Sequence, residues 1–273
     1  GTNYQFCHGY IGKDLANMPV EKLYQALKEK RTIEPLTQRY PDLPIDEAYR
    51  ISQAFLDRRM SNDNESIVGK KIGVTSDAVQ KMLGVFQPDF GFLTNSMQVA
   101  NATTVCISDN LIQPKAEAEI AFRLKRTLKG PGVTPQDVLA ATESIMPCFE
   151  IVDSRIEDWR IKIQDTVADN ASCGIFVLGE KEFDPQGLDL AALTVEVFKN
   201  DEKISTGKGA AVQGNPLAAV AWLANTLGSL GTPLLAGEII LSGSLVPLEP
   251  VVAGDKFTMK LVQLGGTAAV SFS

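Results

Sequence analysis

The chain has 273 residues, 44% of them hydrophobic and 22% charged, and a formal net charge of -7. This composition is typical of a globular protein, and an acidic balance without any Lys/Arg block excludes a nucleic-acid surface or an anionic membrane as partner. The longest apolar runs fall well short of the roughly 20 residues that span a bilayer, and no signal peptide is visible, so we expect a cytoplasmic protein.

Metal and triad chemistry based on histidine or cysteine is excluded by spacing. The four cysteines form no CxxC pair, and the single histidine, His8, lies in an aperiodic stretch at the start. A Cys/His zinc site needs several closely spaced Cys or His ligands, and a Ser-His-Asp triad needs a histidine in the folded core, so neither is expected. The cysteines are expected to be reduced thiols.

The first part of the chain is predicted to be helical. Apolar residues recur at helical spacing from Val20 to Leu27, and a second helix is expected with Asp46 as its cap and a stripe that includes Ile51 and Phe55. The polar sequence SNDNES ends this pattern. We therefore expect a small helical N-terminal subdomain over residues 1–65.

Residues 66–273 are predicted to be mostly β with a few helices. The segments IVGKKIGV, EAEIAFRL, IMPCFEIVD and GEIILSGSL have strand character, and TVEVFKNDEKIST predicts a hairpin with Asn200 and Asp201 at its turn. Helices are expected after Thr134, which precedes a proline, and from Asn215 to Gly228. The fold class is therefore α+β, with no internal repeat.

Two carboxylates stand two residues apart in PKAEAEIAF. On a strand, Glu117 and Glu119 share a face with Arg123, while Ala118 and Ile120 point the other way into a core. A solvated face with Arg123 as a partial counter-charge is one interpretation. The other is that the pair supplies oxygen ligands to a hard cation such as Mg²⁺ or Mn²⁺.

Glu150 is the natural third ligand of such a cation. It interrupts the apolar run IMPCFEIVD, where burying an unpaired charge costs several kcal/mol. A salt bridge with an arginine such as Arg155 is the alternative interpretation.

GKKIGVTS and QPDFGFL add a cation and a further carboxylate. On an alternating strand, one of Lys70 and Lys71 should point inward, where a lysine steadies developing negative charge; two surface lysines are the alternative. Asp89 could act as a general base, or it could simply form a turn.

Two polar segments are candidates for contacts with a substrate carboxylate. The loop TVADNASCG contains Ser172, and it is also compatible with an Asx turn. The segment SGSLVPLEP places Ser242, Gly243 and Ser244 after an apolar strand, where backbone N–H groups could hold an anion.

Taken together, the ordered motifs GKKIGVTS, QPDFGFL, PKAEAE, MPCFEIVDSRIEDW, VADNASCG, STGKGAAVQGNP and LSGSLVPLEP resemble the fumarylacetoacetate hydrolase superfamily. Within it, the chain is most similar to the 2-hydroxypenta-2,4-dienoate (2-keto-4-pentenoate, vinylpyruvate) hydratases of aromatic meta-cleavage pathways, from about Val20 to the C-terminus. The resemblance implies a mixed β-roll with a helical N-terminal subdomain, a small-molecule dienoate substrate and a homo-oligomer that could also associate with the pathway decarboxylase.

The resemblance also implies roles for individual residues. Glu117, Glu119 and Glu150 become the ligands of a divalent metal, Mg²⁺ or Mn²⁺. Lys71 and Asp89 become catalytic groups that act on the 2-oxygen and on the added water. Ser172 and the small residues of the SGS segment become substrate contacts. The catalytic histidine of the hydrolases has no counterpart, which disfavours C–C bond hydrolysis.

The implied activity is hydration of 2-hydroxypenta-2,4-dienoate to 4-hydroxy-2-oxopentanoate. Its nearest rival is the sister 2-oxo-3-hexenedioate (4-oxalocrotonate) decarboxylase, because stabilising an enolate serves both reactions. The SGS sequence, where such decarboxylases tend to have TGG, favours the hydratase. A non-catalytic partner subunit would be expected to lack part of the carboxylate triad, and here all three residues are present.

Overall fold

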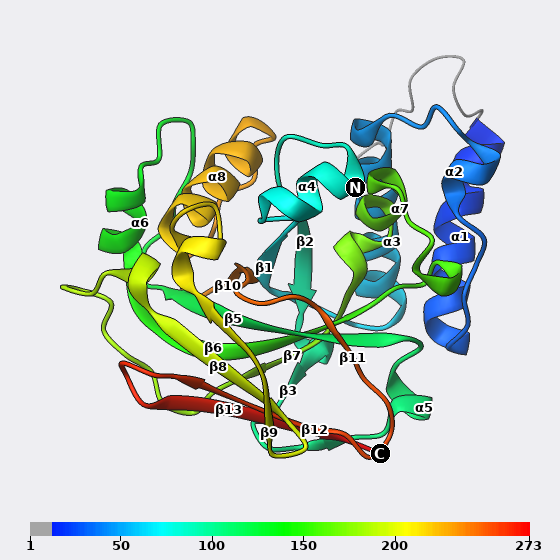
Figure 1. The fold of residues 1–273 in the computed structure, drawn as a ribbon. Helices are drawn as coiled ribbons and strands as arrows, with labels where there is room; N and C mark the ends of the chain where they lie inside the picture. Colours follow the sequence, from blue (N-terminus) through cyan, green and yellow to red (C-terminus); the bar gives the residue numbers. More distant parts are fainter. Residues whose placement is uncertain (1–12) are drawn as a thin grey trace.

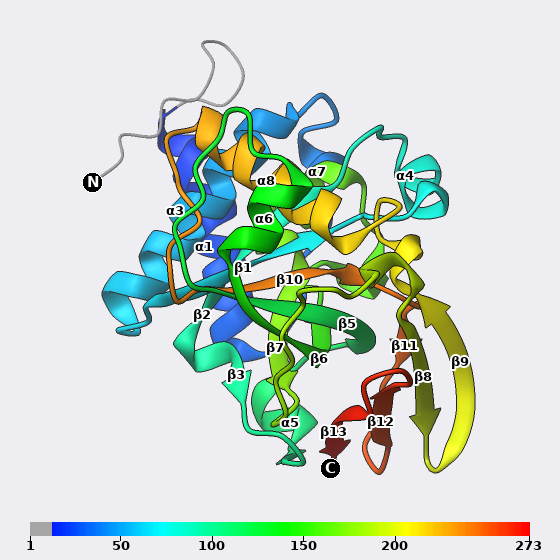
Figure 2. The same cartoon turned by 90° about the vertical axis from the view of Figure 1, so that its left-hand side faces the viewer.

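The structure is a computed structural model that describes residues 13–273; residues 1–12, with His8, lie outside the described part. Figures 1 and 2 show helices on one side of a large curved sheet and a smaller sheet on its other side. The helices are α1 Lys13–Glu29, α2 Leu36–Arg39, α3 Ile45–Asn62, α4 Asp77–Leu83, α5 Ile107–Asn110, α6 Pro135–Ala141, α7 Ile163–Ala168 and α8 Pro216–Ser229. Among the described helices, none is both long and apolar enough to cross a membrane.

Within residues 13–273, the strands form two mixed sheets. The eight-stranded sheet has the order β2-β1-β10-β5-β6-β7-β3, with β11 paired to β5, and the five-stranded sheet has the order β4-β13-β12-β8-β9. The strands are β1 Ile67–Gly73, β2 Asp89–Thr94, β3 Gln98–Val99, β4 Thr104–Val105, β5 Pro114–Leu124, β6 Thr142–Asp153, β7 Cys173–Leu178, β8 Thr194–Lys199, β9 Glu202–Lys208, β10 Ile239–Ser244, β11 Glu249–Pro250, β12 Lys256–Leu261 and β13 Gly266–Phe272. The α+β expectation is confirmed.

The main hydrophobic core lies between the two sheets and under α6 and α8. The predicted alternation along β5 is seen directly, since Ala118, Ile120, Phe122 and Leu124 are all at most 1% exposed in this core. Glu117, Glu119 and Ala121 therefore face the opposite side of β5. The curved centre of the large sheet is thus apolar on one face and carries carboxylates on the other.

A second core joins the N-terminal helices to a later part of the chain. Leu23, Ile51 and Phe55 are buried here together with Ile156 and Val167, the latter from α7. We propose the boundary between the helical subdomain (1–65) and the β-roll (66–273) where α3 has ended and β1 is about to begin. Packing against α7 fixes these helices beside β1 and β2.

Most of the predicted local signals are present. Thr134 accepts a hydrogen bond from the Asp137 N–H at the start of α6, and Asn215 accepts one from the Leu217 N–H at the start of α8. The β8–β9 hairpin turns at two residues with positive φ, Asn200 and Asp201 (53° and 67°).

The expected cap of the second helix is wrong. The helix α3 begins at Ile45 with Pro44 in the capping position, so Asp46 lies in the first turn. Proline has no N–H and a fixed φ, which places the helix start directly after it. The Asp46 carboxylate instead interacts favourably with the positive N-terminal end of the helix dipole.

Candidate active site

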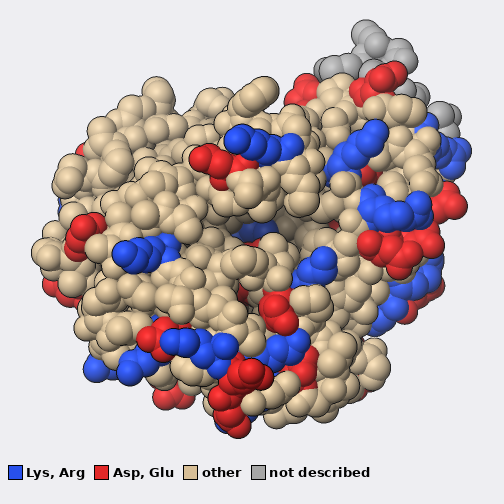
Figure 3. All heavy atoms as spheres, in the orientation of Figure 1, with Lys and Arg blue, Asp and Glu red and all other residues tan. Residues whose placement is uncertain are grey.

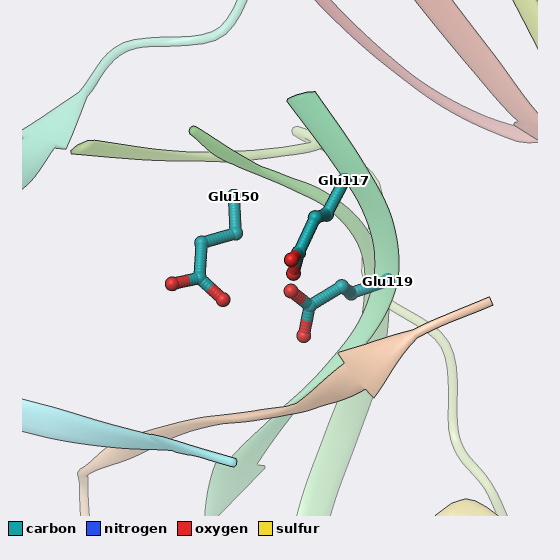
Figure 4. Close-up of side chains that lie close together, drawn as sticks. All are labelled: Glu117, Glu119 and Glu150. Atoms are coloured by element: carbon teal, nitrogen blue, oxygen red, sulfur yellow. The ribbon is translucent and has the colours of Figure 1, made fainter. Parts of the chain in front are cut away.

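Three glutamates converge on the concave side of the large sheet. Glu117 pairs directly with Glu150 across β5 and β6, and Glu119 lies two residues further along β5. One ligand oxygen from each of the three lies within 4.8 Å of the others. Figure 4 shows the three side chains pointing toward a common point in front of the curved β5. The strand register, rather than closeness in sequence, brings Glu150 to the pair.

Lys71 reaches this cluster from β1, which is two strands away from β5 and three away from β6 in the sheet order. On a flat sheet with strands about 4.8 Å apart, β1 and β6 would lie roughly 14 Å from each other. Nevertheless the Lys71 Nζ lies 3.2 Å from the Glu150 Oε2, and both side chains are almost fully buried. The curvature of the sheet therefore creates the site by bringing the tips of distant side chains together.

Asp89 lies beside Lys71 at the start of β2. It is 3% exposed, and it pairs with Gly73 across β1 and β2. A Cβ atom at Gly73 would overlap the Asp89 Oδ1 and would lie 3.5 Å from the Lys71 Nζ. Glycine at this position thus leaves the space in which the Asp89 carboxylate approaches the lysine, and the expected turn at Asp89 is replaced by a buried strand position.

The cluster carries more negative charge than its surroundings neutralise. Among the described residues, the Glu119 Oε2, the Glu150 Oε1 and the Asp89 Oδ1 are buried without a hydrogen-bond or ion-pair partner, and the Glu150 Oε2 has the Lys71 Nζ at 3.2 Å. Leaving buried carboxylate oxygens unpaired is costly, and carboxylates are the ligands that Mg²⁺ and Mn²⁺ prefer. The donor set and its orphaned oxygens therefore fit a hard divalent cation.

The pKa values in the site reflect the same imbalance. Burial, aided by the Glu150 charge, raises the pKa of Glu117 to about 7. Burial together with Glu150 and Glu117 raises the pKa of Glu119 well above its usual range. A bound cation would release these protons, because it favours the ionised carboxylates.

The two other ionisable groups shift in the same direction for different reasons. Burial alone would lower the pKa of Lys71, but the neighbouring carboxylates, Glu150 first, raise it well above its usual value. Burial raises the pKa of Asp89 despite the opposing effect of Lys71. Lys71 is thus held as a cation, while Asp89 is a stronger base than a solvated aspartate.

Gly243 orients one of the glutamates. Its backbone N–H donates a hydrogen bond of 2.8 Å to the Glu119 Oε1, and its φ is +123°, which is easy only for glycine. Ser242 donates to the Ile120 carbonyl at 2.7 Å, and the Ser244 hydroxyl donates to the Val246 carbonyl at 2.5 Å. The SGS segment therefore holds β10 against β5 at the level of the cluster.

The polar loop before β7 is tied down by internal contacts. Asn170 accepts from the Phe92 N–H and donates to the Phe92 carbonyl, while the Ser172 hydroxyl lies 2.8 Å from that of Thr166. Residues 170, 171 and 172 all have φ between 50° and 56°, a strained run of left-handed backbone. These contacts lock the loop against β2, the strand that carries Asp89.

The geometry corrects three expectations about charged side chains. Both lysines of β1 are buried rather than one, because Lys70 meets Glu238 at 2.6 Å on the face opposite Lys71. Arg155 does not pair with Glu150; its Nε donates to the Asp169 Oδ1 at 2.6 Å.

Arg123 is likewise no counter-charge for the glutamates, since its Nε lies 2.8 Å from the Glu182 Oε1. The glutamate cluster thus has Lys71 as its cationic partner within residues 13–273.

Tyr49 is a neighbour of the site that sequence reasoning missed. Its ring stacks on Phe90 with centroids 4.3 Å apart, and its hydroxyl accepts a hydrogen bond from the Phe90 N–H. Burial raises the pKa of Tyr49, and the neighbouring Asp89 charge raises it further. The contact joins α3 to β2 across 41 positions, so no local pattern signals it.

Figure 3 shows that this face of the molecule is hollowed near its middle, between α4 and the segment from β10 to β11. Basic and acidic atoms are visible within the hollow. Charged groups inside a concavity, surrounded by mainly uncharged atoms, are the usual setting of an active site.

The chain is similar to known proteins over most of its length. The fumarylacetoacetate (FAA) hydrolase C-terminal family model matches residues 68–270. A 2-hydroxyhexa-2,4-dienoate hydratase from Comamonas testosteroni is 56% identical over 254 residues, which are 93% of this chain and 96% of that protein. A 2-hydroxypent-2,4-dienoate hydratase from Pseudomonas putida is 57% identical over 81% of this chain and 99% of its own length.

A solved structure shows the same fold. The 4-oxalocrotonate decarboxylase from Pseudomonas putida G7, complexed with magnesium and adipate, superposes with a TM-score of 0.91 at 35% identity, covering 96% of this chain and 99% of that one. From the matched family model, the relatives and the site geometry together, the chain belongs to the fumarylacetoacetate hydrolase superfamily and, within it, to the 2-hydroxypentadienoate hydratase family.

Proposed function

We propose that this protein is a hydro-lyase that adds water to 2-hydroxypenta-2,4-dienoate and gives 4-hydroxy-2-oxopentanoate in aromatic meta-cleavage catabolism. The observation that carries the proposal is the cluster of three converging carboxylates with Lys71 at 3.2 Å from Glu150 and Asp89 beside it. The names of relatives at 56% and 57% identity support the same reaction.

Glu117, Glu119 and Glu150 are the residues that would hold a divalent cation, for which we propose Mg²⁺ or Mn²⁺. The magnesium in the structure of the related decarboxylase supports this choice. When bound, such a cation supplies Lewis-acid stabilisation of a 2-oxo acid's enolate. Gly243 fixes the direction of one ligand oxygen through its N–H.

Lys71 and Asp89 divide the remaining work. The buried ammonium of Lys71 favours negative charge on the substrate's 2-oxygen as the 2-hydroxyl loses its proton. C5 gains one proton in return, which forms the conjugated 2-oxo-3-enoate. Asp89 then accepts a proton from water as the water oxygen bonds to C4, and a proton is delivered to C3. The elements of one water molecule are thus added across C3 and C4.

We also propose roles for the remaining polar residues and an assembly of the protein. Ser172 and the segment 242–244 are candidates to contact the substrate's carboxylate; the hydrogen bond from the Gly243 N–H to Glu119 supports the segment 242–244, and the packing of the Ser172 loop against β2 supports Ser172. A homo-oligomer, or an association with the pathway decarboxylase, is proposed from the family resemblance alone. Light scattering of the purified chain, alone and mixed with that decarboxylase, tests both.

The reaction is tested with freshly generated dienoate and Mg²⁺ or Mn²⁺, by following loss of ultraviolet absorbance. The Glu150→Gln variant should lose turnover. Its metal affinity should fall by roughly 100-fold or more, because loss of a residue that only supports a metal ligand can already lower the affinity by that factor. Glu143→Gln, at an exposed position of the same strand, is the matched control. Full activity and metal affinity in Glu150→Gln would show that the triad is wrongly assigned.

Decarboxylation of 2-oxo-3-hexenedioate is the second candidate function. The 35% identity with the 4-oxalocrotonate decarboxylase favours it specifically. Supplying the dienoate and the dioate in separate reactions discriminates the two, because only decarboxylation releases CO₂. Release of CO₂ faster than hydration would replace the proposed function by the alternative.

A further inference from the structure

The segment 205–216 (STGKGAAVQGNP) runs from the end of β9 to the start of α8, and it supplies none of the proposed ligands or catalytic groups. One of its residues, Gln213, binds the backbone carbonyl of Thr75 twice. The Gln213 Nε2 donates a hydrogen bond of 2.7 Å to this carbonyl, and the Gln213 backbone N–H donates a second one of 3.3 Å. The two residues are 138 positions apart, so the contact joins this segment to the loop that follows β1.

Thr75 lies directly against the glycine that orients Glu119. A Cβ atom at Gly243 would lie 2.5 Å from the Thr75 Oγ1 and 2.6 Å from its Cγ2, and Thr75 is buried. The Thr75 side chain thus fills the space beside the Gly243 Cα and prevents the backbone from moving toward the loop after β1. The Gly243 N–H is the group that donates to the Glu119 Oε1 at 2.8 Å. The position of Thr75 therefore limits where this donor can lie.

The loop that carries Thr75 needs contacts from outside to keep its shape. Val74, the preceding residue, has a φ of +55°, which is unfavourable for a β-branched side chain, and Gln213 itself has a φ of +51°. Such backbone persists only where its surroundings determine it. The Val74 carbonyl accepts a hydrogen bond of 3.0 Å from the Gln80 Nε2, and the next carbonyl accepts from Gln213. Two glutamine side chains thus hold consecutive carbonyls of one strained loop.

The segment 205–216 also packs against the residue that follows SGS. A Cβ atom at Gly207 would lie 2.0 Å from the Leu245 carbonyl oxygen, so only glycine allows this close approach of β9. The Leu245 N–H donates a hydrogen bond of 2.9 Å to the carbonyl of Ala118, which stands between the two glutamates of β5. The segment therefore supports Gly243 from two directions, through Thr75 and through Leu245.

We propose, on the basis of the metal-dependent hydratase function above, that Gln213 is a positioning residue for the metal ligand Glu119. The Gln213 amide fixes the Thr75 carbonyl, and the Thr75 side chain limits the Gly243 backbone. The Gly243 N–H in turn directs the Glu119 Oε1. Without the Gln213 amide, the carboxylates remain on their strands but Glu119 is less well oriented. This matters most for Mg²⁺, which demands near-ideal octahedral geometry, and less for Ca²⁺, which accepts a flexible one.

The proposal is tested by the dissociation constants of Mg²⁺ and of Ca²⁺, measured by calorimetric titration of the metal-free chain. Gln213→Leu keeps a side chain of similar size but loses the amide donor. Its Mg²⁺ affinity should fall by about 10-fold, the lower end of the effect of losing a residue that supports a metal ligand. Its Ca²⁺ affinity should fall by about threefold or less, because Ca²⁺ tolerates a displaced ligand.

Gln186→Leu is the matched control. Gln186 is exposed, and its amide likewise donates to a backbone carbonyl, that of Leu139. Both affinities should be unchanged in this variant. Equal loss of affinity for the two cations in Gln213→Leu, or no loss for either, would overturn the positioning role and leave the hydratase function intact. A parent chain that bound neither cation would instead refute the proposed metal-dependent function, and the positioning role with it.

Thr75 provides a second test, which decides the matter if Gln213→Leu does not fold. Thr75→Ala removes the two atoms that lie closest to Gly243, so it should weaken Mg²⁺ binding more than Ca²⁺ binding. Thr75→Val fills nearly the same space and should keep both affinities near those of the parent. If Thr75→Ala leaves the ratio of the two affinities unchanged, or if Thr75→Val lowers it as much as Thr75→Ala does, packing against Gly243 does not orient Glu119.

Discussion

Replacing Glu117 by glutamine should stabilise the metal-free protein at pH 8. Burial, aided by Glu150, raises the pKa of Glu117 to about 7 from an ordinary value of 4.5. Since one pKa unit corresponds to about 1.4 kcal/mol, ionising this carboxyl in the folded chain costs about 3 kcal/mol more than in the unfolded chain. Glutamine has nearly the same shape and no charge, so the variant avoids this cost.

The sign of the pH dependence follows from proton binding. The folded metal-free chain binds the Glu117 proton more tightly than the unfolded chain, so its stability falls as pH rises from about 4.5 to about 7 and is then constant. The free energy of unfolding of the variant minus that of the parent should therefore be near zero at pH 4.5 and about 3 kcal/mol at pH 8. Urea unfolding in a chelator measures it.

Adding metal should reduce the stability advantage of the variant at pH 8 from about 3 kcal/mol to about 1 kcal/mol. At Mg²⁺ one hundred times the parent's dissociation constant, the parent gains about 2.7 kcal/mol, whereas a variant with roughly 100-fold weaker binding gains about 0.4 kcal/mol. Glu143→Gln, exposed on β6, should change nothing in either condition. A Glu117→Gln variant no more stable than the parent in chelator at pH 8 would refute the reasoning.

Three further substitutions test the surroundings of the cluster. Gly73→Ala, whose Cβ would overlap the Asp89 Oδ1, should lower kcat by roughly 100-fold with little change in Tm; an unchanged kcat would remove Asp89 from the reaction. Gly243→Ala adds a Cβ at a residue with φ +123°, and this Cβ would lie 2.5 Å from the Thr75 hydroxyl oxygen, so stability should fall by about 1 to 3 kcal/mol. The variant should also bind Mg²⁺ more weakly in a calorimetric titration, whereas strain that leaves Glu119 in place would not change the affinity. Arg155→Met should cost about 3 to 5 kcal/mol in urea unfolding because it leaves Asp169 buried without its cation, and a smaller loss would mean that water reaches Asp169.

Local patterns predicted the elements that carry the site, because periodicity and capping act over a few residues. The alternation of β5 placed Glu117 and Glu119 on one face, and the burial of the intervening residues confirms it. The position of Glu150 inside the apolar run IMPCFEIVD suggested it as a third ligand, and the resemblance to a known family implied the same triad. The direct pairing of Glu117 with Glu150 depends on the β5–β6 register, which no short stretch of sequence specifies.

Long-range contacts account for what the sequence did not predict. The pattern suggested one inward lysine on β1, but the partner of Lys70 is Glu238, which is 168 positions away. Whether a charge is buried depends on such a partner, so the pattern of β1 alone could not reveal that both faces are covered. The Tyr49 contact and the contact of Gln213 with Thr75 likewise arise where separate elements pack, and neither has a signature in one segment.

The origin of the site in separate strands affects how the protein loses its structure. Lys71, the two glutamates of β5 and Glu150 come together only when β1, β10, β5 and β6 are all paired and curved. A folding intermediate with only β5 and β6 paired would present the three glutamates without Lys71 and without the Gly243 N–H that orients Glu119. A cation that binds the completed arrangement more tightly than such an intermediate mainly slows the escape from the native state. The metal would then lower the unfolding rate and lengthen the lifetime of the folded enzyme, in addition to its part in the reaction.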